Sequence, residues 1–291
     1  MFEQVTVRVP ATTANLGAGF DCLGMALALT QEITLRIGPG EEQPGGLGRL
    51  VCDAARSAYR LAHVPVPMEL TASGKTSIPI GRGLGASAAA RAAGVVGANA
   101  LMGGRLSEEQ MLTLGANLEG HADNMAPALF GGLQIVVREE GGWQRLRAPV
   151  AEGLRIVLFI PDFDMPTNES RRLLPQQVSR EDAIYNVSRA ALMVAALGAG
   201  AWDALATAAG DRLHQPARAH IFPAMEQIFA AARAEGAHAA YLSGGGSTIA
   251  AFVTRNEARI GAAMQEAAAA AGFSGHVKIT HPSSEGAAVI G

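Results

Sequence analysis

Three glycines at alternate positions lead directly into an alanine-rich run in this chain, over residues 79–90 (PIGRGLGASAAA). Glycines let a backbone approach ligand oxygens closely. The N–H groups and the dipole at a helix N-terminus favour negative charge. We expect the alanine-rich residues 88–100 to form that helix. The segment therefore indicates a phosphate-binding loop, and its alternative interpretation is a tight turn that merely precedes a helix.

This loop matches neither of two common nucleotide-binding patterns. A Walker A loop needs Gly-x4-Gly-Lys-Ser/Thr, and the candidate around Lys75 has Glu69 where the first glycine belongs. The dinucleotide pattern Gly-x-Gly-x-x-Gly/Ala can be read across residues 81–86. However, the chain does not begin with repeated β-α-β units, and no acidic residue stands at a strand end about 20 positions later.

The composition excludes several classes of protein to which the chain could belong. The 291 residues are enough for two domains, and the 49% hydrophobic and 17% charged residues support a large core and argue against disorder. A net charge of −3 argues against a general nucleic-acid binder. The sequence has no apolar run of membrane-spanning length and no secretory signal at its start, and Cys22 and Cys52 have no metal-binding or redox spacing. We therefore expect a cytoplasmic protein without membrane partners.

Strand-like and helix-like segments are mixed along the chain, which predicts an α+β architecture with two layered lobes. Residues 161–179, with three prolines, are the predicted junction. Ser107 and Gln110 form a capping box, and Asn256 is a predicted cap. The predicted strands are 5–9, 26–37, 68–70, 77–80, 133–138, 155–160, 239–242, 248–253 and 277–280, with turns at 73–74 and 141–142. The predicted helices are the alanine-rich helix, which follows Ser87 and ends at Gly103 and Gly104, and 50–61, 108–119, 180–197, 200–213, 223–235 and 257–271.

Residues 15–21 (NLGAGFD) place Asn15 and Asp21 in a glycine-hinged loop after the first predicted strand. Both side chains are able to contact a polar ligand. The alternative is a turn in which they hydrogen-bond their own backbone. Taken alone, the segment is better explained as that turn.

Residues 119–124 (EGHADN) gather polar groups at the end of the capped helix. The Glu119 carboxylate is a suitable Mg²⁺ ligand, because this hard cation prefers oxygen. His121 and Asn124 are able to hydrogen-bond a substrate. The alternative is a polar helix end in solvent, which the apolar residues 127–132 beside it make less convincing.

Two further features of the second half of the chain have either a functional role or a purely structural one. Residues 243–248 (SGGGST) form either a plain hairpin or a backbone that lies against a ligand. Arg171, four residues after Thr167, and Arg218, within 211–218 (DRLHQPAR), offer guanidinium groups that bind carboxylates in bidentate fashion. Exposed arginines are more commonly present only for solubility.

Together and in this order, residues 10–24, 81–90, 119–129 and 243–248 resemble the homoserine kinases of the GHMP superfamily (galacto-, homoserine, mevalonate and phosphomevalonate kinases). The resemblance spans residues 5–290. It implies a ribosomal-protein-S5-domain-2-like N-terminal domain at 1–155 and a ferredoxin-like C-terminal domain at 156–291. It also implies ATP- and Mg²⁺-dependent phosphorylation of L-homoserine to O-phospho-L-homoserine in threonine biosynthesis, and a possible homodimer.

The same resemblance implies roles for individual residues. Ser87 and Glu119 would bind Mg²⁺, Asp21 suits the substrate ammonium, and His121, Asn124 and Arg171 would be catalytic. The ATP phosphates would contact Pro79, Ile80, Gly81, Arg82, Gly83, Leu84, Gly85, Ala86, Ser87, Ala88 and Ala89. Homoserine would contact Asn15, Asp21, His121, Asn124, Thr167, Arg171, Arg218 and Gly245, with the two arginines on its carboxylate.

Three positions bear on chemistry within this resemblance. Ala86 stands where the family has a serine, and Ser247 stands where it has a proline, which puts the rigidity of that loop in question. Asn124 stands where mevalonate kinases have an aspartate base, so we expect no strong protein base. The alternatives are a sister GHMP kinase of the mevalonate type and a catalytically silent ligand-binding homologue.

Overall fold

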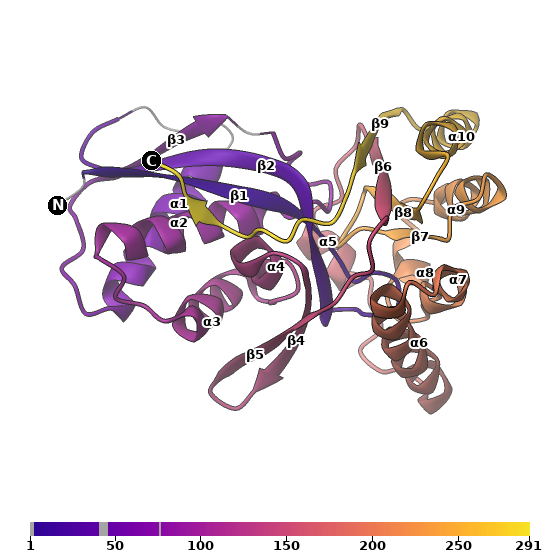
Figure 1. The fold of residues 1–291 in the computed structure, drawn as a ribbon, viewed down its shortest axis with the longest axis horizontal. Coiled ribbons are helices and arrows are strands. Elements are labelled where there is room, and N and C mark those ends of the chain that lie inside the picture. Colours follow the sequence, from indigo (N-terminus) through magenta and orange to yellow (C-terminus); the bar gives the residue numbers. More distant parts are fainter. Residues whose placement is uncertain (1–2, 41–45, 76) are drawn as a thin grey trace.

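The computed structural model describes residues 3–40, 46–75 and 77–291, and it contains two antiparallel sheets side by side (Figure 1). The first sheet has the order β10-β1-β2-β4-β5, and β3 pairs with the far end of β2. Its strands are β1 (Gln4–Ala14), β2 (Leu23–Ile37), β3 (Leu70–Lys75), β4 (Leu133–Glu139), β5 (Gly142–Ala148) and β10 (Ala288–Val289).

Four helices pack with this sheet: α1 (Leu47–Leu61), α2 (Ala86–Leu101), α3 (Glu108–Glu119) and α4 (Met125–Phe130). The central helix is α2, which contacts α1, α3, α4, β1 and β2. Its small residues permit this close packing, because a Cβ added at Gly94 would lie 2.2 Å from the Val51 carbonyl oxygen of α1. The small residues of α2 thus let this helix pack closely against its neighbours.

The second sheet has the order β7-β8-β6-β9 and consists of β6 (Arg155–Pro161), β7 (Ala239–Leu242), β8 (Ile249–Val253) and β9 (Gly275–Thr280). With α9 (Met225–Ala234) and α10 (Glu257–Ala270) packed on it, this is the β-α-β-β-α-β ferredoxin-like arrangement that was expected. The remaining helices are α5 (Thr167–Arg172), α6 (Arg180–Ala199), α7 (Leu205–Ala208), α8 (Gln215–Arg218) and the 3-10 helix η2 (Trp202–Ala204).

The C-terminal segment returns to the first sheet. After β9 the chain runs back across the molecule, and β10 pairs with β1 through Val7–Val289 and Arg8–Ala288 (Figure 1). The first sheet therefore contains residues from both ends of the chain. The division into domains at 155/156 stays a prediction.

Four predicted elements differ from the structure. Of the strand expected at 68–70, only Leu70 belongs to β3. No turn occurs at 73–74, because β3 continues through Gly74, where a Cβ would lie 2.3 Å from the Glu32 carbonyl oxygen of β2. Residues 77–80 form no strand. The helix expected over 200–213 ends early, since the Asp211 carboxylate accepts the N–H groups of residues 213–215 and competes with helical hydrogen bonds.

Two smaller differences concern helix ends. The helix α4 was not predicted, and Asn256 precedes α10 without a side-chain capping hydrogen bond. The Ser107–Gln110 capping box of α3 and the hairpin between β4 and β5 are confirmed.

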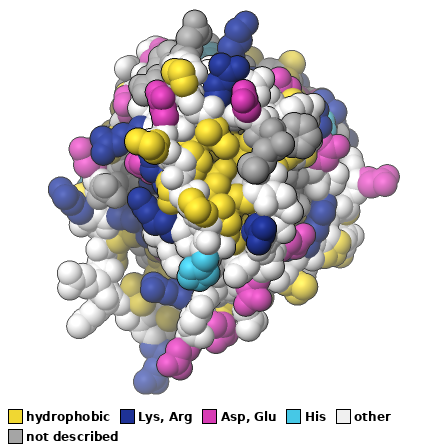
Figure 2. All heavy atoms as spheres, turned by 90° about the vertical axis from the view of Figure 1, so that its left-hand side faces the viewer, with side chains coloured by type: hydrophobic (Ala, Val, Ile, Leu, Met, Phe, Trp, Pro, Cys, Tyr) yellow, Lys and Arg dark blue, Asp and Glu magenta, His cyan; other side chains and the backbone are white. Residues whose placement is uncertain are grey.

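The surface carries ordinary mixtures of side chains. Seen from the left-hand end of Figure 1, hydrophobic side chains gather near the middle of the face with charged ones around them (Figure 2). Such mixtures are common on protein surfaces. In the described part of the chain, no helix has the length and apolar character needed to cross a membrane.

Candidate active site

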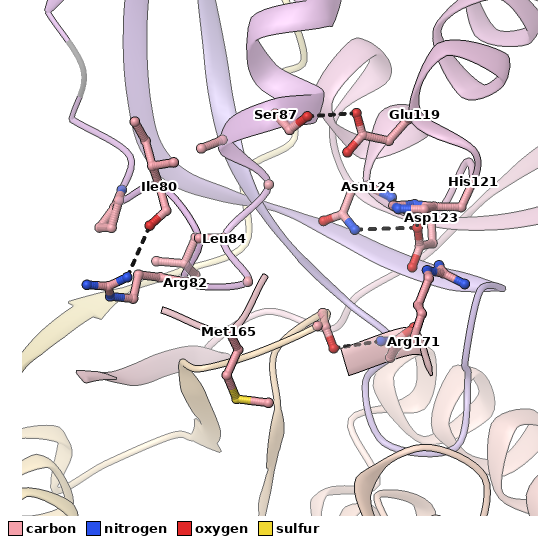
Figure 3. Close-up of a pocket in the computed structure, with 18 of the residues that line it drawn as sticks. Ile80, Arg82, Leu84, Ser87, Glu119, His121, Asp123, Asn124, Met165 and Arg171 are labelled. Atoms are coloured by element: carbon pink, nitrogen blue, oxygen red, sulfur yellow. Dashed lines mark hydrogen bonds and ion pairs between the residues drawn. The ribbon is translucent and has the colours of Figure 1, made fainter. Parts of the chain in front are cut away.

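A cavity of about 300 Å³ lies where the two sheets meet. One wall is the segment 79–87 with the N-terminus of α2, and Met165 and Arg171 lie across from it (Figure 3). Arg218 and Gly244 also line the cavity. Glu119, His121 and Asn124 line a third side. The cavity therefore collects side chains that lie far apart in the sequence.

The glycine loop is shaped by left-handed backbone. Gly81, Gly83 and Gly85 have φ angles of 68°, 72° and 72°, which favour glycine. Space is also tight, because a Cβ at Gly83 would lie 2.1 Å from the Ser243 carbonyl oxygen and one at Gly85 would lie 1.9 Å from Thr12 Oγ1. Gly85 is the N-cap of α2 and provides no side-chain cap, so the first N–H groups of this helix face the cavity end of the loop.

The glycine loop and the segment 243–248 hold each other. Ser243 Oγ donates to the Gly83 carbonyl oxygen at 2.7 Å, and the Thr248 N–H donates to the Arg82 carbonyl oxygen at 3.1 Å. The Ser247 hydroxyl donates to the Phe163 carbonyl oxygen at 2.7 Å, a contact that proline at this position would lack. The two loops thus form one unit across the two sheets.

Ser87 and Glu119 meet at the helix end of the cavity (Figure 3). Ser87 Oγ donates to Glu119 Oε2 at 3.0 Å. Arg91, one turn further along α2, donates from Nη1 to both the Ser87 hydroxyl and Glu119 Oε2. The Ser87 hydroxyl, the Glu119 carboxylate and the Arg91 guanidinium therefore all contact one another.

His121, Asp123 and Asn124 form a connected group. His121 Nδ1 lies 2.6 Å from Asp123 Oδ1, and the Asn124 N–H donates to the same oxygen at 2.9 Å. Burial alone would lower the pKa of His121, but the hydrogen bond and charge of Asp123 raise it above its usual value. Thr12 Oγ1 donates to Asn124 Oδ1 at 2.7 Å, which fixes the orientation of the amide.

The Asn15–Asp21 loop is both a turn and part of the site. Asn15, Leu16 and Asp21 have positive φ angles of 69°, 46° and 55°, which are strained for residues other than glycine. Asn15 Oδ1 accepts the Asp21 N–H at 3.0 Å, as expected for a turn. Its Nδ2 donates to the Gly244 carbonyl oxygen at 2.8 Å, which connects this loop to the glycines at 243–248.

Arg171 and Asp21 form a bidentate ion pair in this structure. The two guanidinium nitrogens of Arg171 donate to the two Asp21 oxygens at 2.9 and 2.5 Å. That hydrogen bond, with the nearby carboxylates, raises the pKa of Arg171. The half-buried Phe20 ring lies 5.3 Å from the Arg171 guanidinium carbon and 5.5 Å from that of Arg218. Phe20 therefore supports both guanidinium groups.

Arg218 is 1% exposed, which is unusual for a charged residue. Its Nη1 donates to His214 Nδ1 at 2.7 Å and to the Gly244 carbonyl oxygen at 3.1 Å, while its buried Nε has no hydrogen-bond partner in the described structure. Burial, with the charge of Arg171, lowers the pKa of Arg218 to about 10, so the group stays cationic at neutral pH. A buried cation with an unused donor is suited to an anionic ligand group.

Known proteins match this architecture. The family of GHMP kinases N terminal domains matches residues 49–132, and the GHMP kinases C terminal family matches residues 193–270. The chain is 43% identical to a homoserine kinase of Moorella thermoacetica, over 98% of this chain and 99% of that protein. The chain belongs to the GHMP kinase family. GHMP kinases use ATP as phosphate donor, so it is an ATP-dependent kinase that acts on an alcohol.

Two more relatives agree with this assignment. A homoserine kinase of Thermus thermophilus is 42% identical, over 86% of this chain and 87% of its own. The crystal structure of homoserine kinase from Cytophaga hutchinsonii superposes with a TM-score of 0.87 at 27% identity, covering 100% of this chain and 98% of that one. The two-domain GHMP kinase fold expected from the sequence is confirmed.

The cavity of this GHMP kinase brings most of the expected residues together. The members that line it are Asn15, Pro79, Ile80, Gly81, Arg82, Gly83, Leu84, Gly85, Ala86, Ser87, Glu119, His121, Asn124, Arg171, Arg218 and Gly245. Ala88, Ala89 and Asp21 do not line it, and the Thr167 side chain lies outside the described part of the structure. The Arg82 guanidinium binds the carbonyl oxygens of Pro161 and Asp162 at 2.8 and 2.6 Å.

Four residues of this kinase site were missed from the sequence: Thr12, Arg91, Asp123 and His214. Asp123 stands between His121 and Asn124, so its position in a polar cluster was an available signal. Arg91 follows Ser87 at the i+4 spacing, which places both on one helix face. Thr12 meets Asn124 only through a tertiary contact. His214 contacts Arg218, four residues further along the chain, at 2.7 Å and the distant Gly17 carbonyl oxygen at 2.8 Å.

Proposed function

We propose that this kinase transfers the γ-phosphoryl group of ATP to the side-chain hydroxyl of L-homoserine, giving O-phospho-L-homoserine for threonine biosynthesis. The observation that carries this proposal is the composition of one cavity. It joins a glycine loop at a helix N-terminus to two guanidinium groups from the other lobe, Arg171 and Arg218. A phosphate donor and an amino-acid carboxylate would therefore bind within one site.

The glycine loop suits the ATP phosphates. Its left-handed glycines leave no side chain between the backbone and a ligand, and the N-terminus of α2 favours anions. Leu47, Leu50 and Ile80 line the same cavity and offer an apolar surface for the nucleobase. We assign these residues to nucleotide binding.

The donors Ser87 and Glu119 fit Mg²⁺. Both are hard oxygen ligands, and Mg²⁺ is commonly held by one or two carboxylates together with substrate phosphates. The described residues contain no group of three or more His, Cys, Asp or Glu side chains that would form a complete cage. Bound there, the ion would neutralise charge on the phosphates.

The acceptor end suits a zwitterion. Arg218, with its unpartnered Nε, would bind the carboxylate of homoserine, and Arg171 would contribute a second guanidinium. Asp21 would bind the ammonium group. Because Asp21 and Arg171 pair with each other in this structure, substrate binding would exchange that ion pair for contacts to the ligand.

The hydroxyl proton has no base in Asn124, the residue that stands where mevalonate kinases have an aspartate. The Asn124 amide is not basic, and its Oδ1 already accepts from Thr12. We propose that the homoserine oxygen forms its bond to Pγ as the bond from Pγ to the ADP oxygen breaks. The hydroxyl proton leaves late and passes to a phosphoryl oxygen. Catalysis then depends on positioning and charge neutralisation.

An assay of ADP release with Mg²⁺ tests this function. Homoserine, mevalonate and galactose would be offered as acceptors under identical conditions. We expect turnover with homoserine. Turnover only with mevalonate or galactose would sink the homoserine assignment, and no turnover with any acceptor would favour a silent ligand-binding protein. A homodimer and a cytoplasmic location stay predictions, which light scattering and cell fractionation would test.

A further inference from the structure

Arg91 occupies the space that the two oxygen donors of the metal site share. It stands on α2 one turn after Ser87, and its Nη1 donates to both Ser87 Oγ and Glu119 Oε2. The Arg91 and Glu119 side chains are only 19% and 11% exposed, so solvent screens their ion pair poorly. The Ser87 hydroxyl donates to the same Glu119 oxygen at 3.0 Å.

A divalent cation and this guanidinium would compete for the same atoms. The lone pairs of Glu119 Oε2 and of the Ser87 hydroxyl are the ones a metal would use. Arginine keeps its positive charge at all ordinary pH values, so it does not leave by deprotonation. A cation that binds here alone must therefore displace a charged partner and gains at most one carboxylate in return.

We propose that Arg91 is the resident counter-ion of Ser87 and Glu119, so that a divalent cation binds only together with the nucleotide. This inference rests on the proposed metal site. The phosphates of the nucleotide bring the additional negative charge that lets the ion replace the guanidinium at Glu119. In the nucleotide-free enzyme the guanidinium holds Glu119 in place and keeps free metal ions out.

Titration with Mn²⁺, followed by electron paramagnetic resonance, tests the inference without measuring activity. We expect R91Q to bind Mn²⁺ about tenfold or more tightly than the parent in the absence of nucleotide. With ADP present, the difference between the two should shrink to about twofold, because the guanidinium is already displaced. Arg145→Gln, which removes an ion pair to Glu108 on another face, is the matched control and should leave Mn²⁺ affinity unchanged.

The outcomes separate this inference from the metal site itself. If E119Q does not weaken Mn²⁺ binding in the R91Q background, Glu119 is not a metal ligand and both ideas fall. If E119Q does weaken it, but R91Q binds nucleotide-free Mn²⁺ no more tightly than the parent, only the role of Arg91 is overturned. Arg91→Met keeps the aliphatic stem, and it replaces R91Q if circular dichroism shows that R91Q is unfolded.

Discussion

Arg218 is the side chain on which the acceptor end of the cavity depends. Replacing it with lysine keeps a charge but removes the planar guanidinium that contacts His214 and Gly244 and that would bind the substrate carboxylate. We expect R218K to raise the KM for homoserine about tenfold or more and to leave the KM for ATP within about twofold. Steady-state kinetics with each substrate varied in turn measures both constants.

The neighbouring Arg212 provides the control for that comparison. It is exposed and pairs with Glu181 and Asp182 at 3.3 and 3.2 Å, away from the cavity. R212K should have the kinetics of the parent. Equal increases of both KM values in R218K would contradict a role confined to the acceptor.

His214 makes stability depend on pH. Burial, opposed by the Asp211 charge and aided by that of Arg218, lowers its pKa from 6.5 to about 4. Between these values the unfolded chain binds the proton and the native state does not, so the free energy of unfolding falls as the pH falls, by about 3 kcal/mol over the window. In denaturant unfolding measured from pH 7 to pH 4, the free energy of unfolding of H214Q should fall less steeply than that of the parent.

The exposed His276 on β9 is the matched position for that test. His276→Gln should leave the pH dependence of unfolding as it is in the parent. An H214Q profile as steep as that of the parent would show that His214 is not the group responsible.

At the scale of elements, the glycine segment before α2 leaves little room for an added methyl group at Gly83. Gly83 and Gly103 have similar φ angles, 72° and 77°, but a Cβ at Gly83 meets the Ser243 carbonyl oxygen while one at Gly103 meets nothing within 4 Å. Gly103→Ala should lower the free energy of unfolding by about 1 kcal/mol. Gly83→Ala should lower it by about 2 to 4 kcal/mol and also weaken ADP binding.

Thermal unfolding and ADP titration of the two variants distinguish backbone strain at a positive φ angle from the close contact of the added Cβ with the Ser243 carbonyl oxygen. If both variants lost the same stability, backbone strain alone would explain the effect. The contact between the two loops would then contribute nothing measurable.

Elements whose signals are local were predictable, and those set by distant contacts were not. The capping box of α3 and the alanine-rich α2 follow from short-range patterns. The helix expected over 200–213 is an exception, because the contacts of the Asp211 carboxylate with the N–H groups of residues 213–215 that end it are local. Within the site, family resemblance found Arg218 and Glu119, whereas the contact of Thr12 with Asn124 joins residues 112 positions apart and leaves no pattern in the sequence.

At the scale of the whole molecule, β10 closes the edge of the first sheet. Deleting residues 287–291 would expose backbone donors and acceptors of β1, and open strand edges pair with other chains. We expect a lower melting temperature and concentration-dependent association, measured by calorimetry and light scattering. Val289→Thr retains the backbone pairing and should stay like the parent. A truncated chain with unchanged melting temperature would contradict this role of β10.

The return of the chain to β10 also limits how the lobes can move. The two chain crossings, at residues 149–155 and 281–284, line one groove. The contacts of Ser243 with Gly83 and of Thr248 with Arg82 fasten the lobes at a second place. Two separate connections oppose rotation of one lobe against the other, so we expect a preformed cavity rather than one assembled by closure. Small-angle X-ray scattering curves recorded with and without ADP and homoserine should coincide. The enzyme would then bind its substrates without a large movement of one lobe against the other.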